Sequence, residues 1–434
     1  MIKKLVLVFV ALIAIQSYGQ EGTASPYSFY GIGSLKFKGT VENRSMGGIG
    51  VFIDSIHVNL RNPASYVTKN IEAWDNQSRP VKFAVGGSYT STNLKAEDGS
   101  DTSKSTTFDY IAINIPAGKF GFGLGLLPYT SVGYKLESLN DANDLENRFT
   151  GEGGLNKAFL GMAYQITDGL SFGVDAQYNF GNIRNSIVEY VYDNGVITQY
   201  QSRETNRSDL SGLNFNFGLS YNRMLTNKLQ LAATATYTPE SELVSKNERS
   251  IATIITNSST GQEIVNNSID VDLEGLGLEE TELTLPSKLS FGLGIGQPRK
   301  WFAGAEYTTQ KTSNFSNDLF SSNTTSYEDA STISVGGFFI PDYRSLTNYL
   351  KRSVYRAGVR YEKTGLVINT ESIKEFGISF GVGLPLSGGI SNANFGVEIG
   401  KRGTTNNNLI QENFINFQLS LSLGDRWFQK RKYN

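Results

Sequence analysis

The chain has 434 residues, a formal net charge of −2 and no cysteine. The absence of cysteine excludes disulfides, thiol nucleophiles, thiolate metal sites and a lipid-anchored N-terminal cysteine. The single histidine, His57, leaves little basis for histidine-based metal or triad chemistry, and the basic residues form no stripe that would predict a nucleic-acid partner.

Residues 1–19 have the features of a secretory signal peptide. Lys3 and Lys4 precede an apolar stretch, and Ser17-Tyr18-Gly19 puts small residues at both positions that determine cleavage. We predict cleavage before Gln20. The alternative, a helical membrane anchor, would need ~20 consecutive apolar residues, and no stretch of the chain supplies them.

Residues 20–80 lack the repeated strand pattern that follows them. They contain Gly-rich stretches and one short apolar run from Gly47 to Ile53. Because this segment precedes the first expected strand, it could lie outside the sheet or fold against the inner face of the sheet.

From residue 81 onward, large apolar residues alternate with small or polar ones. Near the C-terminus, Ile415, Phe417 and Leu419 alternate with Asn416 and Gln418. This period of two is the signature of a β-strand with one apolar face. The same pattern recurs at 120–126, 170–178, 213–221, 289–295 and 378–384.

A soluble β-sandwich also alternates, but three features favour a membrane barrel. One face carries Phe and Leu while the other is small or polar, and the segments reach the length that tilted membrane strands require. Aromatic residues near segment ends are typical of interfacial girdles: Tyr129, Tyr134, Tyr221, Tyr237, Tyr307, Tyr361, Trp427 and Phe428. We therefore predict an all-β fold, a transmembrane antiparallel up-and-down β-barrel in the outer membrane of a Gram-negative bacterium.

The pattern predicts about fourteen strands, an even number as in single-chain bacterial barrels. Their ranges are 81–94, 105–115, 119–136, 155–166, 170–190, 205–223, 228–250, 280–296, 300–315, 324–340, 353–363, 371–386, 391–402 and 409–426. We expect tight periplasmic turns at 167–169 and 226–227 and long extracellular loops at 137–154 and 251–279. The predicted domains are a signal peptide (1–19), an N-terminal hatch or plug (20–80), a barrel (81–428) and a basic tail (429–434).

Two short motifs in the N-terminal segment carry a family resemblance. Arg44-Ser45-Met46-Gly47-Gly48-Ile49-Gly50-Val51, followed by Asn62-Pro63-Ala64, resembles the hatch signature of the FadL/TodX family of outer-membrane transporters. Segments 285–288 and 355–361 resemble other motifs of these barrels, and 424–432 resembles members from Bacteroidota. The resemblance implies a fourteen-stranded barrel with an N-terminal hatch in its lumen. A lumen of that width is too wide for wall side chains to fill, so a plug is physically reasonable.

The resemblance also implies a route for hydrophobic molecules, which leave sideways through a gap beside an inward kink in the third strand. Pro128, Tyr129 and Gly133 are our candidates for this lateral gate, because Pro128 has no N–H to donate to a neighbouring strand. The alternative is that Pro128 marks the extracellular end of the strand.

The candidate ligand or lumen residues are Phe52, Ile53, Arg356 and Arg360. Phe52 and Ile53 are expected to line an apolar pocket beneath the extracellular loops, together with apolar residues of 251–279. Arg356 and Arg360 should share the lumen face and could bind a carboxylate head group, although pairing with Asp54 or Glu398 is the favoured interpretation. Met46, Gly47, Gly48, Gly50, Asn62, Pro63 and Ala64 form the hatch motif, in which Asn62 and Pro63 are expected to fix a turn.

No pattern in the sequence indicates an enzyme, a metal site or a cofactor. The leading hypothesis is a channel for passive uptake of small, fatty-acid-like hydrophobic compounds by lateral diffusion through the barrel wall. The alternative is a non-transporting accessory barrel or shuttle in a larger machine, such as the type IX secretion or barrel-assembly system, because related barrels share the motif. The implied partners are outer-membrane lipid and lipopolysaccharide, a hydrophobic small molecule, and, for the alternative, other outer-membrane proteins.

Overall fold

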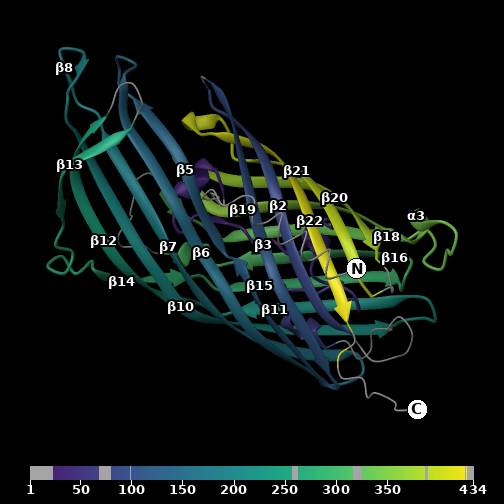
Figure 1. Ribbon diagram of the computed structural model, residues 1–434. Helices are drawn as coiled ribbons and strands as arrows, with labels where there is room; N and C mark the ends of the chain where they lie inside the picture. The colour runs from purple at the N-terminus through teal and green to yellow at the C-terminus, as the bar shows by residue number, and fades with distance from the viewer. Residues whose placement is uncertain are drawn as a thin grey trace.

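The computed structural model describes residues 23–67, 80–97, 99–256, 262–315, 325–386, 390–425 and 427. These residues form a closed antiparallel β-barrel of fourteen wall strands (Figure 1), which confirms the predicted fold class. The predicted signal peptide (1–19) and basic tail (429–434) lie outside the described residues. Within the described part of the chain, no helix is long and apolar enough to cross a membrane.

The wall strands follow one another in chain order, and β22 closes the ring by pairing with β2. Four wall strands are interrupted and carry two labels each. The strands are β2 (Val81–Lys95), β3 (Ser100–Ala117), β4 (Phe120–Pro128) with β5 (Thr130–Leu139), β6 (Leu145–Gln165), β7 (Leu170–Glu189), β10 (Gln201–Met224), β11 (Gln230–Thr238) with β12 (Ser241–Thr256), β14 (Glu280–Leu285) with β15 (Lys288–Gln297), β16 (Trp301–Gln310), β17 (Thr325–Tyr327) with β18 (Ala330–Phe339), β19 (Val354–Ile368), β20 (Glu371–Pro385), β21 (Asn392–Arg402) and β22 (Gln411–Asp425).

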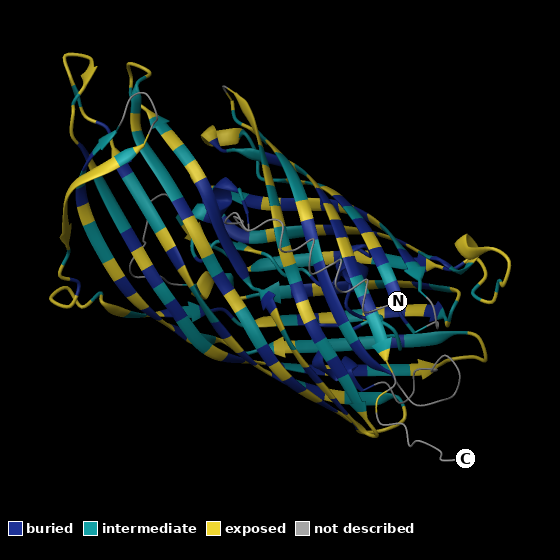
Figure 2. Cartoon of the chain, in the orientation of Figure 1, coloured by how far each residue is buried: buried dark blue, intermediate teal, exposed yellow. Residues whose placement is uncertain are grey.

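The outer face of the wall is apolar, as the alternation predicts. Outward-pointing Phe and Leu side chains are exposed, while their sequence neighbours face the lumen, so exposed and buried bands alternate along each strand (Figure 2). In a barrel, this exposed row faces lipid hydrocarbon. It includes Phe120, Phe122, Leu124, Leu213, Phe215, Phe291, Leu293, Ile378, Phe380, Ile415, Phe417 and Leu419.

Two connections that we predicted as long loops are instead largely strand. β5 and β6 are joined by residues 140–144 alone, and β12 continues to Thr256 and pairs with an extra strand, β13 (Glu263–Asp270). In these segments, as at 251–256, apolar and polar residues no longer alternate strictly, so the ladder continues where the hydrophobic alternation ends.

Two girdle assignments are also wrong. Tyr134 is buried, and its hydroxyl donates to Asn185 Oδ1 at 3.0 Å, while Tyr129 packs inside the barrel with the same apolar cluster as Tyr134. The predicted girdle residue Phe428 lies outside the described residues.

The connections define two different ends of the barrel. Short turns at 166–169, 225–229 and 298–300 share one end with the loop 340–353, and the strands extend furthest at the opposite end. Outer-membrane barrels have short periplasmic turns and longer extracellular connections. We therefore call the first end the periplasmic end and the other the extracellular end.

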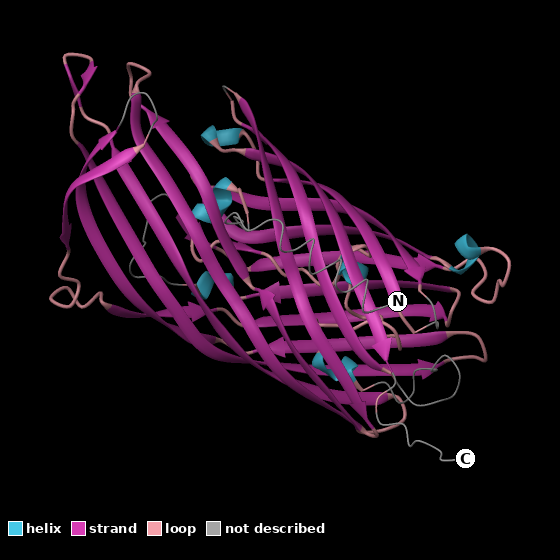
Figure 3. Ribbon diagram, viewed as in Figure 1, coloured by secondary structure: helices cyan, strands magenta, loops and turns pink. Residues whose placement is uncertain are grey.

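The N-terminal segment (residues 23–67) runs through the lumen. Its elements are η1 (Pro26–Phe29), β1 (Ser34–Leu35), α2 (Val41–Arg44) and η2 (Pro63–Tyr66), and Figure 3 shows these short helices among the strands. The elements contact three parts of the wall: η1 and β1 lie on β5, α2 on β20 to β22, and η2 on β3, β4, β6, β7 and β10. The segment therefore occupies part of the space that wall side chains leave open.

Candidate functional site

The first motif of the N-terminal segment docks on one side of the wall. Gly47 donates its backbone N–H to Ser379 Oγ on β20 at 2.9 Å, and the Met46–Gly47 backbone lies directly on Gly336 and Gly358. A Cβ at Gly358 would overlap this backbone. Glycine is thus required here by the close approach of two chains.

The second motif docks on the far side of the lumen. Asn62 Oδ1 accepts from the Ala64 N–H at 2.9 Å, and Asn62 Nδ2 donates to the Leu219 carbonyl of β10 at 2.9 Å. Pro63 occupies the first turn of η2, where its fixed φ suits the helix start. The expected turn is therefore present, and the amide of Asn62 also ties that turn to the barrel wall.

A buried ion-pair network also fixes the segment just ahead of its first motif. Arg360 on β19 contacts Glu375 and Glu398 at 2.6 Å each and Glu362 at 2.9 Å. Lys38 of the N-terminal segment joins the same group through Glu375 at 2.6 Å. Arg360 thus pairs with Glu398, as the favoured interpretation held, and is already satisfied by protein carboxylates.

Other lumen ion pairs extend the same attachment. Arg44 reaches Asp109 and Glu398 at 3.4 Å each. Arg61 pairs with Glu306 on β16, which also accepts the Gly50 N–H at 2.7 Å. The N-terminal segment is therefore bound to the wall by charges on both sides of the lumen.

Arg356 lies two inward positions from Arg360 on β19, with Gly358 between them, and is also buried. Its Nη1 donates to Asn394 Oδ1 at 3.1 Å, and Asn394 Nδ2 in turn donates to Glu42 at 2.6 Å. Arg356 borders the cavity at the periplasmic end. The structure therefore separates the two candidate arginines, since only Arg356 faces open space.

The wall is interrupted beside Pro128. β3 pairs with β4 only from Ile111 to Ala117, and no ladder in the described structure joins β5 to Ser100–Tyr110 of β3. β4 ends at Pro128, but the strand resumes as β5 and continues along β6. Pro128 is thus mid-strand, so the alternative that it marks the extracellular strand end is wrong.

The free edge of β5 is covered from inside by the N-terminal segment. Ser34 and Leu35 of β1 pair with Ser131 and Thr130, and Gly133 donates its N–H to Ser28 Oγ at 3.1 Å. Figure 1 shows this purple part of the chain beside β5. An unpaired backbone edge is costly where lipid excludes water, and β1 supplies the partner that β3 does not.

An apolar cluster lies behind this edge, on the lumen side of the extracellular half. It consists of inward-facing residues of six wall strands, with Phe29, Ile32, Tyr129 and Phe315 packed against them. The wall members are Val132, Tyr134, Leu155, Ile183, Leu210, Leu243, Leu283 and Leu285. Residues of the N-terminal segment therefore cover this apolar surface.

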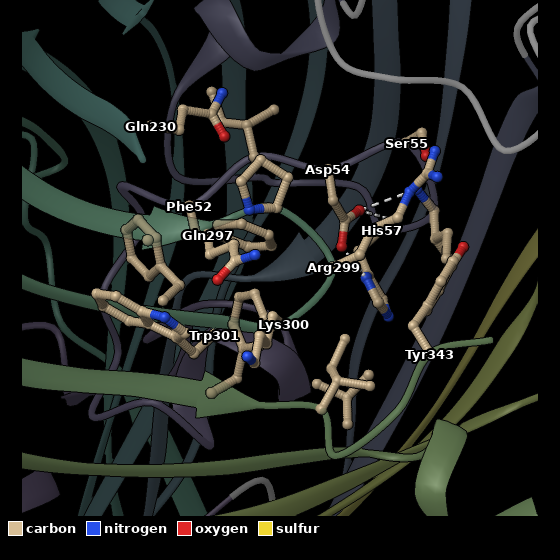
Figure 4. Close-up of a pocket in the computed structure, with 18 of the residues that line it drawn as sticks. Phe52, Asp54, Ser55, His57, Gln230, Gln297, Arg299, Lys300, Trp301 and Tyr343 are labelled. Atoms are coloured by element: carbon tan, nitrogen blue, oxygen red, sulfur yellow. Dashed lines mark hydrogen bonds and ion pairs between the residues drawn. The ribbon is translucent and has the colours of Figure 1, made fainter. Parts of the chain in front are cut away.

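A large cavity lies at the periplasmic end. It has a volume of about 1660 Å³ and is lined by the short turns, by the loop 340–353 and by residues 52–57 (Figure 4). Phe52 packs against Phe302 and Phe338, with ring centroids 5.0 and 4.7 Å apart. We call this cavity the vestibule.

The position of the vestibule corrects the expected ligand pocket. Phe52 and Ile53 line the vestibule, whereas 251–256 and 263–270 belong to β12 and β13 at the extracellular end. These two sets of residues do not share a pocket. The error arose because apolar residues far apart in the sequence were assigned to one surface without any constraint on the path of the N-terminal segment.

His57 and Asp54 form a polar contact at the edge of the vestibule. His57 Nδ1 lies 2.6 Å from Asp54 Oδ2, and the Ile56 and His57 N–H groups donate to Asp54 Oδ1 at 2.9 and 2.6 Å. Burial opposes ionisation of Asp54, but the charge and hydrogen bonds of His57, with Lys82 nearby, hold the pKa of this carboxyl well below its usual range. Asp54 is therefore an ionised anchor for the segment.

The wall residues that bind the N-terminal segment inside the barrel were not identified from the sequence. Glu375, Glu306 and Ser379 each bind the N-terminal segment, but in the sequence they look like ordinary inward-facing polar residues. The charge of Glu375 and Glu306 on a lumen face is the one signal that could have drawn attention to them.

Comparisons with known proteins agree with this architecture. The fold resembles the Ralstonia pickettii toluene transporter TbuX (14% identity, TM-score 0.56, 89% of this chain and 98% of that one). It also resembles a Pseudomonas aeruginosa FadL homologue (12%, 0.56, 90% and 98%) and the Pseudomonas putida toluene transporter TodX (16%, 0.54, 91% and 99%). At these identities the likeness shows a shared FadL-like fold.

No curated protein sequence matches the chain. A family model described as BamG matches residues 1–434. This match spans the whole chain, and the chain belongs to the BamG family.

Proposed function

We propose that this barrel is a non-transporting subunit of a larger outer-membrane assembly, such as the barrel-assembly machinery. The observation that carries the proposal is the N-terminal segment, which is locked across the lumen by two backbone docking sites and a buried ion-pair network. The family name BamG has the form used for subunits of that machinery.

The energetics of the lumen favour a fixed segment over a moving one. Removing one partner of a buried ion pair costs about 3–5 kcal/mol, and the segment contributes Lys38, Arg44 and Arg61 to such pairs. A route past the segment would have to separate several of these pairs at once. A scaffold needs no such movement.

The distribution of apolar surface supports the same interpretation. The apolar cluster behind β5 is covered by Phe29 and Ile32 of the chain itself, and the two sets of residues expected to form a ligand pocket lie at opposite ends of the barrel. A hydrophobic solute would therefore have to displace protein side chains from the cluster before it could bind there.

Affinity purification from native membranes tests the proposal. An epitope-tagged chain should retain other outer-membrane proteins at defined stoichiometry after mild detergent extraction, and its depletion should lower the amount of folded barrels in the membrane. Uptake of radiolabelled toluene or a medium-chain fatty acid should be unchanged in the depleted cells. Recovery of the barrel alone, with reduced uptake, would contradict the proposal.

A second candidate function is favoured by the gap between β3 and β5. This function is passive uptake of small hydrophobic compounds by lateral diffusion, with Pro128, Tyr129 and Gly133 at the opening. TbuX and TodX, which share the fold, are toluene transporters. In this case the N-terminal segment must release the edge of β5, so uptake should fall when β1 is held on that edge.

A further inference from the structure

We infer that the vestibule at the periplasmic end is a docking site for an acidic, partly apolar segment of a partner protein. This inference deepens the proposed assembly role, on which it rests, by naming the surface and the chemistry of the partner. It starts from the charges around the cavity and from the apolar residues that remain exposed beside them.

The charges that line the vestibule are predominantly positive. Seven basic residues border the cavity, against three acidic ones: Arg223, Lys228, Arg299, Lys300, Arg344, Arg352 and Arg356 against Asp54, Asp168 and Asp342. One of the three acids, Asp54, is already bound to His57. The cavity therefore has an excess of positive charge, although the whole chain is slightly negative.

Several of these cations have no acidic partner in the described part of the protein. Lys300 and Arg344 are exposed and form no ion pair among the described residues. Arg352 stacks on the ring of Tyr349 at 5.4 Å, and its buried Nε has no hydrogen-bond partner there. A carboxylate entering the vestibule would satisfy this donor and pair with the neighbouring charges.

The loop between β18 and β19 places apolar residues next to these charges. It carries the short helix α3 (Tyr349–Arg352) and projects beyond the neighbouring turns (Figure 1). Leu346 is 94% exposed and Leu350 is 62% exposed. The loop is nevertheless held in place, because Tyr349 donates its hydroxyl to the Pro385 carbonyl at 2.9 Å.

The loop is fixed and exposes two leucines beside unpaired cations. Protein interfaces combine apolar contacts with complementary charge in the same way. The floor of the vestibule is also apolar, since Phe52, Phe302 and Phe338 pack there. Arg344 and Arg352 line the cavity itself, so their charge is directed to the barrel mouth rather than to surrounding lipid. This placement favours an acidic protein segment over lipid head groups as the occupant.

A binding measurement on the full barrel in neutral-lipid nanodiscs tests the inference. The probe is a short labelled peptide of alternating glutamate and leucine, compared by fluorescence anisotropy with the matching lysine and leucine peptide. We expect the acidic peptide to bind at least about tenfold more tightly, and this preference to shrink as salt is raised from about 0.05 M to about 0.5 M.

The double variant Lys300→Glu/Arg344→Glu should lose the preference for the acidic peptide. Lys95→Glu/Lys104→Glu makes a matched charge change on exposed residues of β2 and β3 at the extracellular end and should keep it. Equal binding of both peptides, or an unchanged preference in the first variant, would overturn the inference. So would displacement of the peptide by phosphatidylglycerol in the nanodisc, which would assign the site to lipid head groups.

The same variants separate this inference from the proposed function. If partner proteins co-purify with Lys300→Glu/Arg344→Glu as they do with the unmodified chain, the docking surface is wrong while the assembly role stands. If the unmodified chain recovers no partner but still prefers the acidic peptide, the assembly role fails and the acidic-segment site is supported.

Discussion

The periplasmic and extracellular halves of this barrel are made from the same strands but are closed in different ways. In the periplasmic half every wall strand pairs with both neighbours, from β2 with β22 to β15 with β16. In the extracellular half, the described β3 and β5 share no ladder. Among the described strands, β14 pairs only with β12 and β17 pairs only with β19, so no ladder joins these two strands across the wall. The wall thus separates into two groups of strands towards the extracellular end.

This difference follows from the solvent that each half meets. Lipid offers no hydrogen bonds, so backbone groups inside the apolar band must pair around the full ring. Further out, the outward residues of β3 are Thr102, Lys104 and Thr106, and water can solvate an open edge. The exposed Phe108 marks the border between the apolar band and the part of the wall that meets water. β1 covers the part of the β5 edge nearest to that border.

The largest expected effect concerns the ion pairs that hold the segment across both halves. Arg360→Met should lower the free energy of unfolding by about 4 kcal/mol, because it leaves Glu375 and Glu398 buried with less compensating charge. Urea titration followed by tryptophan fluorescence measures this loss. Arg207→Met removes an exposed pair with Asp209 and should have no measurable effect; equal stability of both variants would mean that the network does not hold the segment.

A charge on the outer face should distinguish the two halves directly. Phe291→Arg places a cation in the apolar band and should cost about 3 kcal/mol. Thr106→Arg, which is outward on β3 in the open half, should be tolerated. Folding yields in lipid vesicles and urea midpoints give both values, and comparable losses at the two positions would remove the proposed border between hydrocarbon and water.

The close approach of the first motif to the wall predicts a smaller loss. Gly358→Val would push the Met46–Gly47 backbone away from β19 and should cost about 2 kcal/mol. The N-terminal segment should also become cleavable by added protease. Gly99→Ala meets open space and is the control; protection of the segment in Gly358→Val would show that this contact is dispensable.

The smallest expected effect depends on pH. The folded state holds the pKa of Asp54 below its unfolded value, so ionised Asp54 stabilises the fold above the unfolded pKa, and this contribution is lost as pH falls towards the folded pKa. Asp54→Asn should therefore destabilise the barrel by about 1.5 kcal/mol at neutral pH. Thermal unfolding at several pH values should show that the difference in stability between variant and parent disappears only under strongly acidic conditions. A stability difference that stays constant down to strongly acidic pH would mean that the charge of Asp54 does not contribute to the stability of the fold.

The sequence was sufficient for most of the wall. Alternation located the fourteen strands and the lipid-facing row, because hydrocarbon imposes a strict choice at every second position. It failed at 137–154 and 251–279, where strands such as β6 and β12 leave the apolar band and the strict alternation of apolar and polar residues ends. In that region the ladder persists without the pattern that would reveal it.

The candidate site was predictable only in part. Asn62 and Pro63 gave the turn of η2 because turn chemistry is local, and Pro128 marked the break between β4 and β5 because proline cannot donate. The partners of these residues could not be read from the sequence. The contacts of Lys38 with Glu375 and of Gly47 with Ser379 join positions more than 300 residues apart. Tyr134 was misplaced because the inward and outward positions exchange across the break between β4 and β5, so that Tyr134 faces inward.

The central claim is that the barrel works with its N-terminal segment fixed in place, and a single disulfide tests it. Ser34→Cys/Ser131→Cys joins two directly paired residues of β1 and β5, where an antiparallel pair has suitable Cα spacing, in a chain with no other cysteine. We predict that oxidised and reduced forms of this variant retain the same partners and that cells take up radiolabelled toluene equally in both states. Uptake that falls on oxidation and returns on reduction would contradict the claim and establish the segment as a moving gate.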